Sequence, residues 1–195
     1  MKLSKNVIIF NPNNLDSLMG AAIVALKLKQ VRQKYQLVSD VQQNIEEYPS
    51  IPIYEKYDFR LDSNLFIVGI VYPVRWLDYW RSIGISIRLF NNALNDDSVA
   101  SLVWKSLYSN RRPPEIIEHI KCAVSGFNAV GESYNRKSEA IYKAMDSIQS
   151  RCNSLENQIE SCIEFIQGHY SIEELEAVGN VRLNMQRVTG AIMPR

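Results

Sequence analysis

Residues 6–26 read NVIIFNPNNLDSLMGAAIVAL, and this stretch decides the fold class. Its first five residues are mostly apolar and β-branched, which predicts a short buried strand at Asn6–Phe10. The polar turn NPNNLDS follows, and the apolar spacing after it predicts a helix over about residues 17–35. A strand, a polar turn and a helix in this order form the first part of a βαβ unit.

Three further segments have the composition of strands. They are residues 36–41, residues 64–70 and Ser86–Phe90, and the sequence VRWLDYWRS predicts a short helix between the last two. Strands that alternate with helices and have near-continuous apolar runs indicate a parallel sheet covered by helices on both faces. We therefore predict an α/β core over residues 1–112.

The rest of the chain has a helical pattern. Ser98 and the two aspartates before it are N-cap residues for a helix that ends near Tyr108, and a Pro-Pro pair precedes a helix over Glu115–Val124. A last helix is predicted at about residues 171–188. Residues 113–195 are thus predicted to be an all-helical extension, packed on the core or forming a dimer seam.

An apolar residue recurs at alternating spacings of four and three between Ile141 and Ile166, which is a heptad pattern. Two interpretations stay open. The stripe covers the core of its own domain, or it is a homodimer seam, because a strict four-three repeat is narrower than the usual core-facing stripe. Gly168 is predicted to end this helix. Cys162 belongs to the stripe, and the interface candidates are Met145, Ile148, Cys152, Leu155, Ile159 and Ile166.

The composition is that of an ordinary globular domain, with 46% hydrophobic and 22% charged residues among 195. The net charge of +1 does not indicate nucleic acid or an anionic membrane as a partner. Three cysteines without CxxC spacing fit a reducing compartment, and no apolar run approaches the roughly 20 residues of a membrane helix. We therefore expect a cytoplasmic protein. The glycines form no GxGxxG or P-loop motif, and we expect no cofactor.

The candidate binding site is the first strand-to-helix turn. Ligands of open parallel sheets bind outside the carboxyl ends of the strands, and this turn follows Phe10. Its polar side chains are expected beside the N–H groups of the helix start, and the alternative is that Asn14 or Asp16 only caps the helix. Arg75 or Arg88 can supply a cation. The ligand-binding candidates are Asn13, Asn14, Asp16, Ser17, Asn91, Asn92 and Arg75.

Histidine is scarce, with only His119 and His169 in the chain. Neither has a second histidine or a carboxylate at the spacing of a recognised metal motif. We interpret each as a surface or helix-end residue rather than a ligand.

Four segments resemble the DHH phosphoesterase family in order and spacing. NNLDSLMGAAIVAL at residues 13–26 is similar to its first motif, a His-x-Asp-x-Asp-Gly turn that runs into a helix with small residues. LFIVGIVYPVRWLDYW, ISIRLFNNALND and DDSVASLVWKSLY are similar to the next motif, to the strand with the Asp-His-His triplet and to the following helix. The resemblance covers about residues 5–110 and implies the DHH fold.

The resemblance also shows which residues have changed. Most of the family's metal ligands are absent, although two ions such as Mn²⁺ or Mg²⁺ need several carboxylates and imidazoles. The substrate domain with its glycine-rich motif is not found either. In the first motif, Pro12 stands at the position of the family's His and Asn14 at that of its first Asp. Asp16 keeps the second Asp, and Ser17 stands at the position of the Gly. Gly69 stands where the family's second strand ends in Asp. The Asp-His-His triplet corresponds to Phe90, Asn91 and Asn92, and a later Asp of the family would lie near Cys122 or Val124.

We therefore expect a catalytically inactive DHH-like protein that binds a nucleotide or another phosphorylated ligand in the former active-site cleft, for sequestration or sensing. The alternative is a protein-interaction scaffold. A third interpretation is a residual metal-dependent phosphoesterase with a relocated site. Besides the heptad stripe, the candidate scaffold surfaces are the aromatic group Tyr72, Trp76, Tyr79 and Trp80 and the pair Arg111-Arg112.

Overall fold

The computed structural model describes residues 5–40, 62–91, 97–125 and 131–191, with side chains up to residue 185. Within these ranges the chain forms four strands and seven helices. The strands are β1 (Asn6–Phe10), β2 (Tyr35–Ser39), β3 (Asn64–Val68) and β4 (Ser86–Phe90). The helices are α1 (Leu15–Gln30), α2 (Val74–Ser82), α3 (Val99–Leu107), α4 (Glu115–Val124), α5 (Glu132–Gln149), α6 (Leu155–Ile166) and α7 (Ile172–Ala191).

The four strands form one parallel sheet in the order β2-β1-β3-β4. The predicted α/β class and parallel sheet are confirmed. β2 follows β1 on one side, whereas β3 pairs with the other side of β1, in the register Asn6 to Asn64 through Phe10 to Val68. The direction of winding therefore reverses between β1 and β3. In open α/β sheets this reversal opens the crevice in which ligands bind, at the carboxyl ends of the strands.

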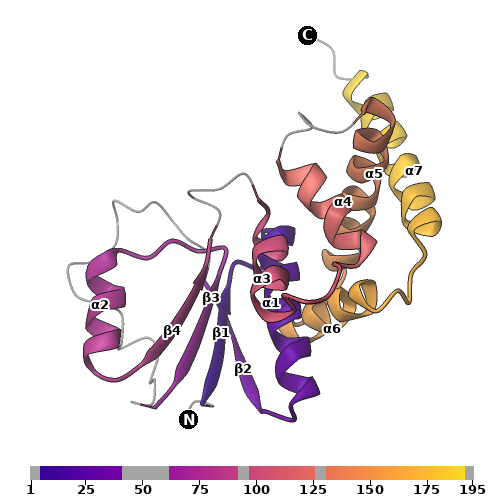
Figure 1. Cartoon of the computed structure of the whole chain (residues 1–195). Helices are drawn as coiled ribbons and strands as arrows, with labels where there is room; N and C mark the ends of the chain where they lie inside the picture. The colour runs from indigo at the N-terminus through magenta and orange to yellow at the C-terminus, as the bar shows by residue number, and fades with distance from the viewer. Residues whose placement is uncertain (1–4, 41–61, 92–96, 126–130, 192–195) are drawn as a thin grey trace.

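Helices lie on both sides of the sheet, with α2 on one face and α1 and α3 on the other (Figure 1). Alternate strand residues point to opposite faces, so Val7 and Ile9 pack with α2 while Ile8 and Phe10 pack with α1. In the aromatic group, three rings are buried in the α2 layer and contact one another, and only Tyr79 is exposed. The buried rings are Tyr72, Trp76 and Trp80.

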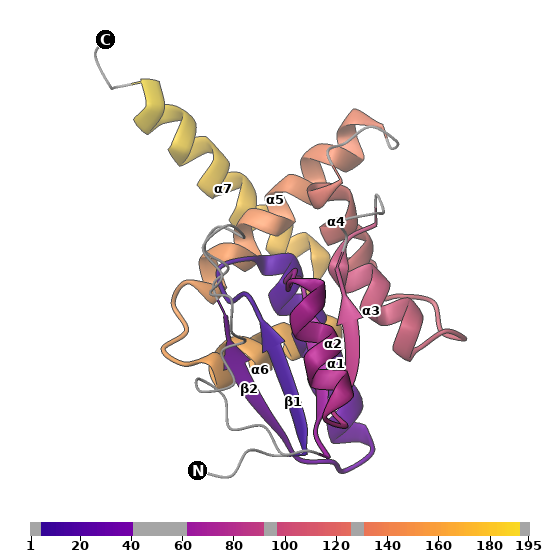
Figure 2. The same ribbon diagram turned by 90° about the vertical axis from the view of Figure 1, so that its left-hand side faces the viewer.

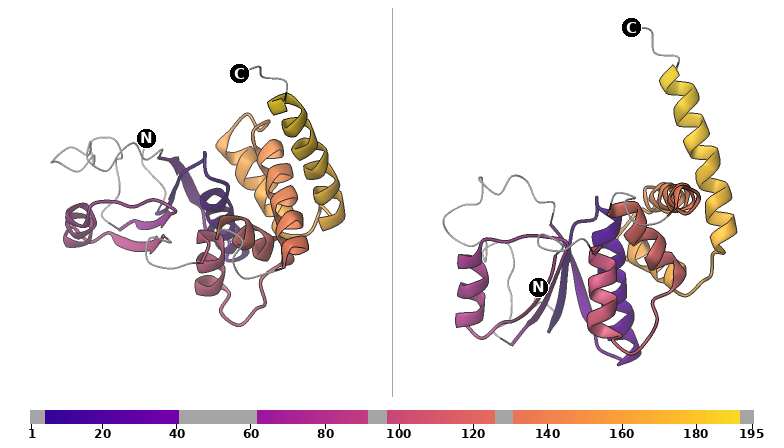
Figure 3. Two further views of the ribbon diagram at one scale, coloured as in Figure 1. Left: turned by 90° about the horizontal axis from the view of Figure 1, so that it is seen from above. Right: turned by 45° about the horizontal axis from the view of Figure 1, so that its top comes forward.

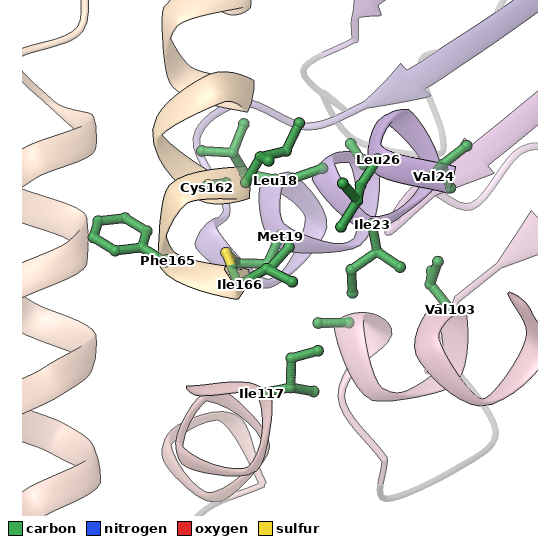
Figure 4. Close-up of a cluster of buried hydrophobic side chains, with 14 of the residues drawn as sticks. Leu18, Met19, Ile23, Val24, Leu26, Val103, Ile117, Cys162, Phe165 and Ile166 are labelled. Carbon is green, nitrogen blue, oxygen red and sulfur yellow. The ribbon is translucent and has the colours of Figure 1, made fainter. Parts of the chain in front are cut away.

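Helix α1 is buried on all sides, since every residue over 15–26 is inaccessible or nearly so. One side packs on the sheet, and the others pack on α3, α4 and α6 (Figure 4). Leu18 and Met19 lie beside Cys162 and Ile166 of α6, and Ile23 lies near α3 and α4. A helix that is apolar all round requires such complete cover. The core of the α/β part and that of the C-terminal helices are thus continuous.

The heptad stripe does not form one helix, and the prediction that it does was wrong. α5 ends at Gln149 and α6 begins at Leu155, so the stripe passes through a turn between two helices. Gly168, with a φ of 76°, follows the end of α6 as predicted. The stripe residues pack within the chain: Met145, Ile159, Cys162 and Ile166 are buried in the main core, Ile148 and Leu155 pack against it, and Cys152 is half-buried.

The last helix, α7, packs against α5 near its start and then extends away from the sheet (Figures 2 and 3). The two backbones touch at Gly179, where an added Cβ would lie 1.8 Å from the carbonyl oxygen of Ala140. Only glycine allows this approach. Among the described residues, no helix combines the length and the apolar character needed to cross a bilayer.

His119 is fully buried between α4 and α5, which corrects the interpretation of a surface residue. Its Nδ1 lies 2.8 Å from Ser138 Oγ, and its ring stacks on Tyr134 with 4.7 Å between centroids. Burial lowers the pKa of His119, although the Glu115 carboxylate 3.4 Å from Nε2 opposes this shift. His119 is therefore a core residue, while His169 is exposed at the end of α6.

Candidate functional site

The candidate site lies where the winding reverses, at the carboxyl ends of β1 and β3. The turn after β1 is held by two asparagine side chains. Asn11 Oδ1 accepts a hydrogen bond from the Asn13 N–H at 2.9 Å, and Asn14 Oδ1 accepts one from the Ser17 N–H at 3.1 Å. Asn14 is therefore the N-cap of α1, one of the two capping residues considered from the sequence.

Ser17 bridges the two strands at this point. Its Oγ donates a hydrogen bond to the Val68 carbonyl oxygen at 2.6 Å and accepts one from the Asn11 N–H at 3.0 Å. Val68 is the last residue of β3, and Asn11 directly follows β1. The side chain is fully buried. The crevice in which α/β sheets usually bind ligands is thus spanned by a serine.

Gly69 leaves room for this serine. A Cβ added at Gly69 would lie 2.6 Å from Ser17 Cβ and 2.7 Å from Ser17 Oγ, both shorter than real Cβ contacts allow. Its φ of 67° is also in the left-handed region that favours glycine. The Gly69 N–H donates to the Phe90 carbonyl oxygen at 2.7 Å, which fixes the end of β3 against β4. Positions 17 and 69 therefore have room for one side chain between them.

Asp16 does not face open solvent but caps a different helix. Its Oδ2 accepts a hydrogen bond from the Val99 N–H at 2.7 Å, and its Oδ1 accepts one from the Ala100 N–H at 2.9 Å. Asp16 as a residue is only 2% exposed. Burial raises the pKa of Asp16, and these two N–H donors with Ser98 act in the opposite direction. Asp16 thus holds α3 to the start of α1.

The other candidates are dispersed. Asn13 is exposed in the turn, Asn91 is half-buried after β4, and Asn92 lies outside the described residues. Arg75 is at the start of α2, on the other face of the sheet from α1. Arg88 lies within β4, with its guanidinium 5.8 Å from the ring of Phe66. The structure therefore unites Asn14, Asp16 and Ser17 in one hydrogen-bonded turn and leaves the predicted cations elsewhere.

A pocket of about 230 Å³ opens beside the turn, between α1, the end of α5 and α6. Four of its lining residues come from the C-terminal helical part, and no pattern in the sequence predicts them because only tertiary contacts bring them to the turn. Gln149 is 4% exposed, and its Oε1 has no hydrogen-bond partner among the described residues, while its Nε2 donates to Cys162 Sγ at 3.2 Å. The polar lining residues are Asn13, Asp146, Gln149, Ser150 and Gln158.

The residues at this edge do not fit a pair of divalent metal ions. Asp16 already accepts two backbone hydrogen bonds, Asn14 caps α1, and Gly69 has no side chain. The described part of the chain contains no group of three or more His, Cys, Asp or Glu side chains placed to hold a metal ion. Comparison with protein-family models, curated proteins and solved structures found no match.

Proposed function

We propose that this chain is a catalytically inactive relative of the DHH phosphoesterases that binds its ligand without hydrolysing it. One observation carries the proposal: at the carboxyl ends of β1 and β3, Ser17 and Asp16 already form hydrogen bonds with backbone groups of the chain itself. A two-metal phosphoesterase of the DHH type would need carboxylates at this edge that are open to metal and substrate.

The exchange of side chains between positions 17 and 69 supports the proposal. The resemblance implies glycine at position 17 and aspartate at position 69, whereas this chain has Ser17 and Gly69. Because the two positions have room for one side chain, the serine and the aspartate exclude each other. An aspartate at position 69 would therefore overlap with Ser17, whose hydrogen bond to Val68 now occupies this place.

The pocket beside the turn suits the nucleoside end of a nucleotide better than its phosphates. Its lining contains the Asp146 carboxylate and three amides, but no lysine or arginine. Carboxylates and amides form hydrogen bonds with ribose hydroxyls and base edges, whereas Asp146 repels a phosphate. A donor group of the ligand can also satisfy the Gln149 amide oxygen, which has no partner among the described residues. We infer that the base and sugar occupy this pocket.

Calorimetric titration with nucleosides and with mono-, di- and cyclic nucleotides tests this binding. We expect saturable binding in the absence of metal, with each nucleoside at least as tight as its nucleotide. Asp146→Asn should weaken nucleoside binding about tenfold, the effect of one hydrogen bond to a charged group. Asp78→Asn on α2, another exposed aspartate, is the matched control and should change nothing.

Absence of saturable heat across the panel would refute ligand binding in this pocket. Titration in the presence of Mn²⁺ tests the third interpretation, in which the protein is a residual metal-dependent phosphoesterase. We expect neither metal-dependent heat nor hydrolysis of phosphodiester and pyrophosphate substrates. Turnover that needs Mn²⁺ would contradict the inactive assignment, whatever the nucleosides do.

A scaffold function is the second candidate, and an exposed stripe on α7 favours it. Val178, Val181 and Met185 are 46%, 54% and 59% exposed and share one face of the helix. They follow heptad spacing, and the sequence continues it at Val188 and Ile192. Contiguous exposed apolar side chains on one helix mark interaction surfaces. The interface would thus be α7 rather than the buried stripe of α5 and α6.

Sedimentation velocity over a range of concentrations tests α7 as the interface. We expect reversible association that Val181→Glu abolishes, because a carboxylate at the centre of an apolar seam loses its hydration. Val74→Glu on α2 replaces a 69% exposed valine and is the matched control. A monomer at all concentrations, or equal association of both variants, would exclude this face as a self-association surface.

A further inference from the structure

A second pocket, of about 300 Å³, lies at the opposite end of the sheet from the turn. Asn6, Asn64 and Ser86 are the first residues of β1, β3 and β4 and stand side by side in register at its edge. The last turns of α1 and α3 complete the walls with Lys27, Leu28 and Leu107. The pocket is therefore separate from the proposed nucleoside site.

The lining of this pocket carries two positive charges and no negative one. Lys27 and Arg88 both line it, and neither aspartate nor glutamate does. Within the described ranges, no carboxylate lies within ion-pair distance of either cation. The neighbouring Lys29 differs, since it pairs with Glu160. The positive charge of the pocket is thus without a counter-charge from the residues that the structure describes.

Aromatic rings hold both cations in place. Lys27 Nζ lies 4.7 Å from the centroid of the Tyr108 ring, and the Arg88 guanidinium carbon lies 5.8 Å from that of Phe66. Contact with a ring face restricts a long side chain without using its N–H donors on an acceptor atom. The donors therefore remain available to a ligand.

The amides at the edge are oriented by one another. Asn64 Nδ2 donates to Asn6 Oδ1 at 3.0 Å, and Asn6 Nδ2 donates to the Lys34 carbonyl oxygen at 3.0 Å and, more weakly, to Gln33 Oε1 at 3.4 Å. Asn6 is 6% exposed, so this network is part of the fold. Because Gln33 Oε1 accepts from Asn6, the amide N–H₂ group of Gln33 is a further donor for a ligand. The Ser86 hydroxyl also lies in the lining of this pocket.

We propose that this pocket binds a small oxyanion of the phosphate class between Lys27 and Arg88. Two cations and neutral donors without a carboxylate match the acceptor-only surface of such an anion. The carbonyl ends of α1 and α3 lie close by and disfavour an anion, so the two side chains must supply the attraction. Loss of either cation should then remove most of the binding. This site is independent of the proposed nucleoside pocket.

Titration calorimetry with inorganic phosphate, and separately with glycerol 3-phosphate as a phosphomonoester, tests the proposal. We expect saturable binding that Arg88→Gln and Lys27→Gln each weaken at least tenfold. Arg81→Gln is the matched control, because it removes the same charge from an exposed site on α2, the other face of the sheet. Asp146→Asn should leave both titrations unchanged, which separates this site from the nucleoside pocket.

The outcomes distinguish the sources of the anion. Equal affinity for both probes supports a free oxyanion, and tighter binding of the ester supports a phosphorylated metabolite. Heat that does not saturate, or an equal loss in Arg88→Gln and Arg81→Gln, would show only a general ionic effect and would overturn the proposal. Arg88 is exposed and Lys27 half-buried, and the unliganded melting temperature of each variant checks that the fold is kept.

Discussion

Replacement of Asp16 by alanine is expected to lower the free energy of unfolding by about 3 kcal/mol. The substitution leaves the N–H groups of Val99 and Ala100 without acceptors at a buried helix start, and each unpaired buried donor costs about 1–3 kcal/mol. The free energy of unfolding of Asp16→Asn should lie between those of the wild type and Asp16→Ala. The amide oxygen can still accept one of the two hydrogen bonds, but the N–H₂ group then faces the other N–H. Urea denaturation followed by circular dichroism measures the difference.

This experiment separates a structural Asp16 from a ligand-binding one. Asn13→Ala in the same turn is the control and should change stability by less than about 0.5 kcal/mol, since Asn13 is exposed. If Asp16 served only to bind metal or ligand, its removal from the unliganded protein would leave stability unchanged. Such a result would contradict the capping role and reopen the question of a functional carboxylate.

Gly69→Ala should destabilise the protein by about 3 kcal/mol. The left-handed backbone contributes roughly 1 kcal/mol of this, and the overlap of the new Cβ with Ser17 contributes about 2 kcal/mol. In a Ser17→Gly background the nearest atom of residue 17 is its Cα, at 3.2 Å from the Cβ position, instead of Cβ at 2.6 Å. The same change should then cost only about 1 kcal/mol, which gives a coupling energy of about 2 kcal/mol in a double-mutant cycle.

Ser17→Ala is the matched control for this cycle. It removes the hydrogen bonds to Val68 and Asn11 but keeps the Cβ that collides with residue 69. Its coupling to Gly69→Ala should therefore be smaller than that of Ser17→Gly, because it relieves only the overlap with Oγ. Equal coupling for Ser17→Ala and Ser17→Gly would show that the overlap with Cβ does not link the two positions.

The sequence predicted several elements closely because their signals are local. β1, β4 and α2 of the α/β part, and α4 after it, begin and end at the predicted residues. In each, a short apolar run or an amphipathic repeat is bounded by polar or proline residues. Asn14 as a cap of α1 was also within reach, since capping acts over three residues.

Contacts between distant residues could not be predicted in this way. Asp16 looks like the ligand of a motif, and the N–H groups it accepts belong to Val99 and Ala100, in another helix. His119 gave no sign of burial because its partner, Ser138, is on the next helix.

The break in the heptad stripe did leave a local signal. Ser154 Oγ accepts a hydrogen bond from the Asn157 N–H at 3.2 Å and caps α6. A serine after the polar residue Asn153 is a typical N-cap sequence, which the continuous four-three spacing concealed. Two helices that pack on the same core can therefore maintain one apolar repeat across the turn between them.

During synthesis, the ribosome releases α1 long before the segments that enclose it. α1 ends at Gln30, whereas α3 begins at Val99 and α6 at Leu155. The nascent chain therefore carries an uncovered apolar helix while most of its length is still being translated, which exposes it to aggregation and to chaperones. Translation must therefore reach α6 before the first helix can be fully covered.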